Sequence, residues 1–428
     1  MFVTDLDDSL PRREFCKAAV ATGGVAALSA CLDRFGGAEP IPTGDGPGAH
    51  PARQHAWNDA VRTDDDGNTL LPRHQLLLYC ELPGDDPPTE TARKRVGAAL
   101  DALDDAFAWD SEGLLHSVAY SRAYFERYGA GPTGVDLPRP RPLADFETPT
   151  FDEQDLLVHL ASDRPAALLA AEEALRGRRD RANGVSVPTL TDAVAVADRR
   201  TGFVGAGMPR DRADDLEGVP ADNPVPEAAP LFMGFVAGFR KNQATEGYVT
   251  LDQGPFAGGT TKAVSNWRQR LADWYEEQSH DERVTELFSP QHAQQGLVEG
   301  VGGELGADSG IDAFLENLDE VAQEHGRIGH AQKAASANRD ADGNVRLLRR
   351  HFESTDDGVA SLHFPSLQRD LDAFEAVRRA MNGVDATAAT PAVRQRVNNG
   401  ILEYVFVRHR GYFLVPPRAK RALPRPDG

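Results

Sequence analysis

The chain has 428 residues, of which 40% are hydrophobic and 26% charged, a length sufficient for two or three folded domains. Its formal net charge at pH 7 is −20, and its basic side chains are almost all arginine, a composition typical of proteins from salt-loving organisms. Such an acidic surface repels phosphate backbones, which excludes nucleic acid as an expected partner.

The N-terminal segment has the pattern of an export signal. In the stretch PRREFCKAAVATGGVAALSAC, the paired Arg12 and Arg13 precede a short, weakly apolar run that ends in LSAC. This pattern predicts a twin-arginine lipoprotein signal peptide over residues 1–31, with Cys31 as the lipid-bearing residue. The apolar run is too short for a permanent membrane helix, so we expect attachment through lipid on Cys31 alone, at the outer face of the cytoplasmic membrane. An ordinary N-terminal helix is the alternative.

Cysteine usage limits the chemistry of the mature protein. Cys16 lies in the signal and Cys31 carries lipid, which leaves Cys80 as the only cysteine of the body. A disulfide within one mature chain and a thiolate metal cluster are therefore both excluded. Cys80 lies in the apolar run LLLYCEL and is expected to be a buried small hydrophobic residue.

After the signal, the sequence predicts a tether and a first folded region. Residues 32–70 are rich in Gly, Pro, Asp and Ala without periodicity, which predicts a flexible tether. Residues 71–216 alternate strand and helix patterns, with Thr89 or Thr91 as a cap for the first helix. The expected strands are 74–82, 113–121, 155–162 and 192–200, and the expected helices are 89–107 and 164–179. This order predicts a ferredoxin-like α+β domain.

A second region repeats this arrangement. The Pro-rich acidic segment 217–230 is expected to be a linker, and residues 231–428 form the second ferredoxin-like domain. The expected elements are strands at 231–239, within 254–277, at 358–364 and at 411–417, and helices at 311–325 and 366–383. We expect the two domains to pack sheet to sheet.

Six segments, in this order, resemble those of the dye-decolourising (DyP-type) haem peroxidases. They are GLLHSVAYSRAYFER, DLLVHLASDRPAALLAAEEAL, GPFAGGTT, HAQKA with VRLLRRHF, LHFPSLQRDLDAF and FLVPP. The resemblance extends over about residues 74–417. It implies the double ferredoxin-like fold of that family, an α+β barrel shared with the chlorite dismutase-like proteins, and haem b as the cofactor.

The resemblance also implies a site. His330 stands where the family has its proximal haem ligand, and Arg349 where it has its distal, catalytic arginine. A neutral imidazole is a good axial ligand to iron, and a permanently charged guanidinium can stabilise a bound peroxide. Hydrogen peroxide and an unknown reducing substrate would be the reactants. The alternative for His330 is an ordinary helix histidine, and Asp370 is expected to be either a carboxylate behind the ligand or a helix-capping acid.

One motif departs from the family. Its GFxDG motif carries an aspartate that moves a proton between the peroxide oxygens, and in TGFVGAGMPR the matching position is Gly205. Loss of such a group costs about 10²–10⁴-fold in rate. His351 could replace it as a base, although a strand-end position pointing elsewhere is the simpler expectation.

The sequence therefore predicts an exported, lipid-anchored haem peroxidase with an altered distal site. A haem-binding or haem-handling lipoprotein, or a haem-free scaffold, is the alternative. A solute- or metal-binding lipoprotein is a third hypothesis, which rests on the export signal alone. The oligomeric state is left open, a homo-oligomer included.

Overall fold

The computed structural model describes residues 40–214 and 216–428, and the segment Ile41–Gly428 forms one compact unit. The export and lipidation residues Arg12, Arg13 and Cys31 lie outside the described residues. In the described part of the chain, every helix is too short or too polar to cross a membrane.

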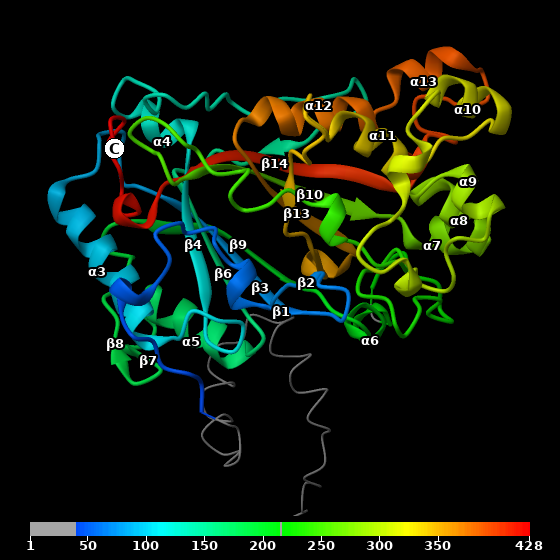
Figure 1. Ribbon diagram of the computed structural model, residues 1–428. Helices are drawn as coiled ribbons and strands as arrows, with labels where there is room; N and C mark the ends of the chain where they lie inside the picture. The colour runs from blue at the N-terminus through cyan, green and yellow to red at the C-terminus, as the bar shows by residue number, and fades with distance from the viewer. Residues whose placement is uncertain (1–39, 215) are drawn as a thin grey trace, which may run out of the picture. The chain divides into compact units, whose positions relative to one another are not determined.

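The first half of the chain builds one antiparallel sheet with helices on its outer side (Figure 1). Its elements are β3 (His74–Glu81), α3 (Glu90–Ala106), β4 (Leu115–Ser121), β6 (Leu156–Ser162), α5 (Pro165–Leu175) and β9 (Ala195–Phe203). The strands lie in the order β9-β3-β6-β4, so that the last strand pairs with the first. This is the ferredoxin-like arrangement that the sequence predicted.

The second half repeats the same strand order. Its elements are β10 (Thr260–Gln269), β11 (Leu348–Arg349), β12 (Phe352–Ser354), β13 (Ser361–Gln368), α12 (Leu371–Met381) and β14 (Val405–Val415). The strands lie in the order β14-β10-β13-β12, and β11 also pairs with β13. Where the first half has one helix after its first strand, the second has five. They are α7 (Leu271–Glu276), α8 (His280–Leu287), α9 (Pro290–Gln294), α10 (Leu318–His325) and α11 (His330–Ala337).

The two sheets join at both edges into a closed ring of strands. β12 pairs with β9 through Glu353 and Phe203, and β14 pairs with β4 through Leu414 and Tyr120. Because successive side chains of a strand point to opposite faces, alternate residues fill the inside of the ring. These inner residues include Leu77, Tyr79, Leu157, Val264, Phe352 and Phe413. The outer residues pack under helices such as α3 and α5. The α+β barrel expected from the sequence is confirmed, whereas the domain limits 71–216 and 231–428 stay predictions.

Shorter elements connect these parts. They are β1 (Arg62–Thr63), β2 (Thr69–Leu70), α4 (Arg122–Glu126), β5 (Thr150–Phe151), β7 (Arg181–Ala182), β8 (Val185–Ser186), α6 (Met208–Ala213) and α13 (Val384–Ala389). The 3-10 turns η1–η8 are Pro47–Ala49, Asn58–Ala60, Arg240–Asn242, Gly303–Leu305, Ile311–Phe314, Asp356–Gly358, Gly400–Glu403 and Arg418–Lys420.

Two predicted elements are wrong. Residues 231–239 are irregular and not a strand, because Gly234 and Gly238 adopt positive φ angles and let three phenylalanines pack into one cluster. The expected helix 311–325 is broken into a 3-10 turn and α10, with Asn317 at a φ of 58° between them. An apolar run can form either a strand or a packed loop, and a helical period can continue through or stop. At these two places, glycine and asparagine residues with positive φ angles interrupt the strand and the helix.

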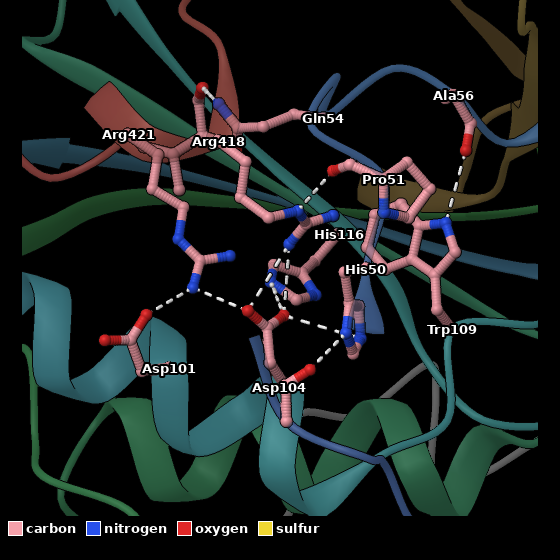
Figure 2. A network of polar contacts seen from close by, with 12 residues as sticks. His50, Pro51, Gln54, Ala56, Asp101, Asp104, Trp109, His116, Arg418 and Arg421 are labelled. Atoms are coloured by element: carbon pink, nitrogen blue, oxygen red, sulfur yellow. Dashed lines mark hydrogen bonds and ion pairs between the residues drawn. The ribbon is translucent and has the colours of Figure 1, made fainter. Parts of the chain in front are cut away.

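The N-terminal segment differs from the flexible tether that its composition predicted. In its described part, Gln54, His55 and Trp57 are buried against the ring. Figure 2 shows how this segment meets the C-terminal tail at Asp104 of α3. Asp104 accepts hydrogen bonds from Arg418 and Arg421, and His50 and His116 lie 3.6 and 3.2 Å from the same carboxylate. A Gly- and Pro-rich segment can be well ordered where such buried partners exist.

Candidate functional site

A cavity of about 790 Å³ opens beside the end of β11. Its walls come from four separate parts of the chain: the β1–β2 hairpin, the turn after β9, the loop 236–245 and the segment 348–351. Sequence-predicted residues Arg349, Gly205 and His351 all line it. The fold therefore brings Gly205 to the same cavity as Arg349 and His351, which are distant from it in the sequence.

Arg349 faces this cavity without a counter-charge. Its Nε donates to Gln243 Oε1 at 3.2 Å and its Nη2 to the Asn242 carbonyl at 3.3 Å, and no carboxylate of the described residues forms an ion pair with it. Burial, together with the charge of Arg339, lowers the pKa of Arg349 to about 10. The guanidinium stays charged at neutral pH, so an anionic group in the cavity would stabilise it.

The whole cavity is positive, although the chain is strongly acidic. Its basic lining residues are Arg62, Arg73, Arg240, Lys241, Arg349 and Arg350, and no aspartate or glutamate of the described ranges lines it. The nearby Glu246 is occupied: its Oε1 accepts from the Arg350 guanidinium at 2.6 Å and from the Trp57 amide. Sequence reasoning found Arg349 among these cations but missed the others, because they come from distant segments.

His330 is the first residue of α11, and its surroundings keep it neutral. Burial, then the charges of Lys333, Arg378 and Arg349, lower the pKa of His330 to about 3. Its ring forms no hydrogen bond with any side chain or carbonyl in the described chain, and the residue is only partly buried. The imidazole therefore presents a free lone pair. Gly400 packs directly on its backbone, where a Cβ would fall 2.8 Å from the His330 nitrogen, so a larger residue would displace the start of α11.

His330 and Arg349 lie near each other, but they do not share the cavity wall. The Arg349 charge reaches His330, yet His330 is not among the residues that line the cavity. Behind His330, the buried Lys333 donates to the carbonyls of Met381 and Asn399 at 2.8 and 2.7 Å. Asp370 caps α12 by accepting from the Ala373 amide, which matches the second of its two expected roles.

Gly205 and His351 are the two lining positions that the sequence analysis linked to proton transfer. Gly205 has a φ of 139°, and a Cβ there would meet the Met208 sulfur at 3.4 Å, so space exists but the backbone favours glycine. His351 is among the residues that line the cavity. Its ring stacks on Phe364 at 6.1 Å, and its buried Nδ1 has no partner. Burial, with the Arg349 charge, lowers the pKa of His351 to about 3.

Other clusters of ionisable residues do not form a metal centre. Across the described ranges, no group of three or more His, Cys, Asp or Glu side chains is arranged to hold a metal ion. The His50, His116 and Asp104 cluster of Figure 2 is already occupied by two arginines. Cys80 is buried, as expected, and burial raises the pKa of its thiol to about 12.

Comparison with solved structures identifies the fold. The chain is similar to the encapsulated DyP-type peroxidase from Mycobacterium smegmatis, with 15% identity and a TM-score of 0.55 over 91% of this chain and 100% of that chain. It is also similar to a DypB variant from Rhodococcus jostii RHA1 in complex with heme, with 17% identity and a TM-score of 0.53 over 86% and 98% of the two chains. At such identities the likeness establishes the fold and not the activity.

The protein thus has the two-part ferredoxin-like fold of the DyP-type peroxidases. Residues 72–417 match the model of a family of unknown function, DUF7405, and the chain belongs to this family. A search among curated proteins finds no match.

Proposed function

We propose that this chain is an exported, lipid-anchored protein that binds haem b, with His330 as the residue that would hold the iron and Arg349 as the residue that would act on bound peroxide. One observation carries the proposal: in a DyP-type fold, an arginine without a counter-charge lines a large cavity, and its charge acts on an imidazole with a free lone pair. A bound haem would provide an iron for the imidazole and negative charge for the guanidinium.

The residues of the cavity wall fit the peripheral groups of a haem in chemistry, and His330 lies outside that wall. The cavity volume of about 790 Å³ is in the range of cofactor sites. Haem carries two carboxylates, and the wall offers Arg73 and Arg240, neither of which is paired with a carboxylate of the described chain. A bound haem would supply an iron that reacts with hydrogen peroxide.

The chain's own residues then set the rate. Arg349 would donate N–H bonds to a peroxide oxygen and offset negative charge there. His351 is the neutral lining residue that would accept a proton, the role that the resemblance assigns to an aspartate at the position of Gly205. With no carboxylate in the described wall, we expect peroxide-dependent oxidation of a small reducing substrate to be slow.

A second candidate, haem handling without turnover, is favoured by the surroundings of His330. A peroxidase ligand usually gains basicity from a carboxylate on its second nitrogen. Here Lys333 and Arg378 contribute positive charge instead, and no carboxylate of the described residues hydrogen-bonds the ring. A less basic ligand binds haem but promotes peroxide cleavage less.

Peroxide turnover by the haem-loaded protein distinguishes the two. With a phenolic reductant, we expect Arg349→Ala to lower the rate by about 10²-fold, since one preorganised charged donor is lost. Arg346→Ala, a change in the same segment outside the cavity, is the matched control. Turnover unaffected by Arg349→Ala, together with haem that exchanges freely to an acceptor protein, would favour haem handling.

A further inference from the structure

A second, small cavity lies in the second half, beside the start of β14. It has a volume of about 150 Å³ and shares no lining residue with the large cavity. Its walls are the loop 146–148, Trp267 of β10, Arg378 of α12, Arg396 and the start of β14. It is therefore distinct from the large cavity and from the network of Figure 2, although the charge of Arg378 in its wall also acts on His330.

Two buried donors in its wall have no acceptor. Trp267 and Arg378 are 3% and 2% exposed, and the indole Nε1 and the guanidinium Nε are buried without a hydrogen-bond partner. The remaining nitrogens of Arg378 are occupied, because Nη2 donates to Glu147 Oε1 at 2.7 Å and Nη1 faces the Met381 sulfur. Both orphan groups can only donate, so neither can satisfy the other. An acceptor is missing from this wall.

The same wall carries excess positive charge. Glu147 is its only acidic member, and that carboxylate already accepts from Arg378, Arg410 and the Leu143 amide. Arg396 donates to backbone carbonyls, and no carboxylate of the described ranges pairs with Arg396 or Arg408. The missing acceptor is thus expected to be negatively charged.

The strand geometry presents Arg408 to this cavity. β10 and β14 slip register at this point: Asn266 pairs with His409 and Trp267 with Val407, so Arg408 is the extra residue of a β-bulge. Bulges re-aim a side chain and are frequent beside binding sites. The β-bulge at Arg408 and the unpartnered donors of Trp267 and Arg378 are two independent observations at the same cavity.

We propose that this cavity binds a small oxyanion of the size of phosphate or sulfate. Its oxygens accept from the Trp267 indole and Arg378 Nε, and Arg396 and Arg408 balance its charge. A water molecule would satisfy a donor but would bring two more hydrogens into a wall of donors and leave the charge unbalanced. The volume holds a few heavy atoms and no larger ligand.

Calorimetric titration of the full-length protein with inorganic phosphate, at constant pH and with ionic strength held by sodium gluconate, tests the proposal. We expect one site per chain, weakened at least about tenfold by Trp267→Phe, which keeps the ring and removes the N–H. Arg408→Gln, at an exposed position that is safe for folding, is expected to weaken binding several-fold. Arg425→Gln, an exposed arginine outside the cavity, is the matched control and leaves the affinity unchanged.

Three outcomes would overturn the proposal. The first is the absence of saturable phosphate or sulfate binding to the folded wild-type chain, which leaves water in the cavity. The second is binding that Arg408→Gln and Arg425→Gln weaken equally, which means non-specific attraction. The third is tighter binding of chloride than of phosphate at the same residues, which makes the site a halide site.

Discussion

At the scale of single residues, the proposed haem site consists of neutral and positive groups. Burial lowers the pKa values of both His330 and His351 to about 3, so both imidazoles are neutral between pH 5 and pH 8. Arg349 remains charged over the same range. These three side chains thus keep one charge state across physiological pH, whereas burial lowers the pKa of Lys333, behind His330, to about 7. Other titrating residues lie elsewhere in the chain.

Glu353, at the join of β12 and β9, is such a titrating residue. It is fully buried, its Oε1 accepts from the Phe232 amide at 2.8 Å, and its Oε2 has no partner. Burial raises the pKa of Glu353 to about 8, so the folded protein holds a proton that the unfolded chain releases above about pH 4.5. Stability is therefore expected to fall as the pH rises from about 5 to 8.

Glu353→Gln, which mimics the protonated acid, tests this linkage. We expect it to raise the free energy of unfolding at pH 8 by about 1–3 kcal/mol and to change it little at pH 5. Denaturant unfolding at the two pH values measures the difference, with the exposed Glu276→Gln as control. An equal effect of Glu353→Gln at both pH values would contradict the assignment.

At the scale of elements, α3 contacts segments from both ends of the described chain through the carboxylate of Asp104. Asp104 is fully buried, and its carboxylate holds Arg418 and Arg421 of the C-terminal tail beside His50 of the N-terminal segment (Figure 2). Removing one partner of a buried ion pair leaves an uncompensated charge, which costs about 3–5 kcal/mol.

We therefore expect Asp104→Asn to destabilise the protein by about that amount and to expose the C-terminal tail to proteolysis. The adjacent Asp105→Asn changes an exposed carboxylate of the same helix and is expected to change stability by less than about 0.5 kcal/mol. Limited proteolysis and thermal unfolding, measured on both variants, check the result. Equal stability of the two variants would show that the Asp104 network does not stabilise the terminal segments.

How well each element could be predicted depends on whether the local sequence or distant contacts determine it. The helix at 89–107 was predicted well because Thr89 caps it and its core residues, Val96 to Phe107, recur at helical spacing. The apolar run 231–239 was misread because its glycines turn the backbone, and hydrophobicity alone does not separate a strand from a packed loop. The order of residues 41–60 depends on partners far along the chain, such as Arg350 and Arg418, which local composition cannot reveal.

At the scale of the whole molecule, the strand order was predictable and the cavity was not. Six ordered segments indicated the fold, and His330 and Arg349 came from the same resemblance. The cations of the cavity wall come from three separate segments, 62–73, 240–241 and 349–350, so no single stretch of sequence reveals that the wall is positive within a chain of net charge −20.

Export remains a prediction at this scale. We expect the wild-type chain to fractionate with membranes of a cell that has twin-arginine export, through lipid on Cys31. Cys31→Ser should move the protein to the soluble extracytoplasmic fraction, and replacing Arg12 and Arg13 together by lysine should keep it in the cytoplasm. Membrane association of the Cys31→Ser variant equal to that of wild type would contradict lipid anchoring.

The absorption spectrum of the haem-supplied protein tests the central claim most directly. In high salt, we expect a Soret band with one haem per chain, lost or shifted in His330→Ala and retained in His325→Ala, a histidine of the neighbouring helix α10. A Soret band unchanged by His330→Ala would contradict the assigned ligand. No Soret band from folded wild-type protein would mean that the DyP-type fold serves this family without haem.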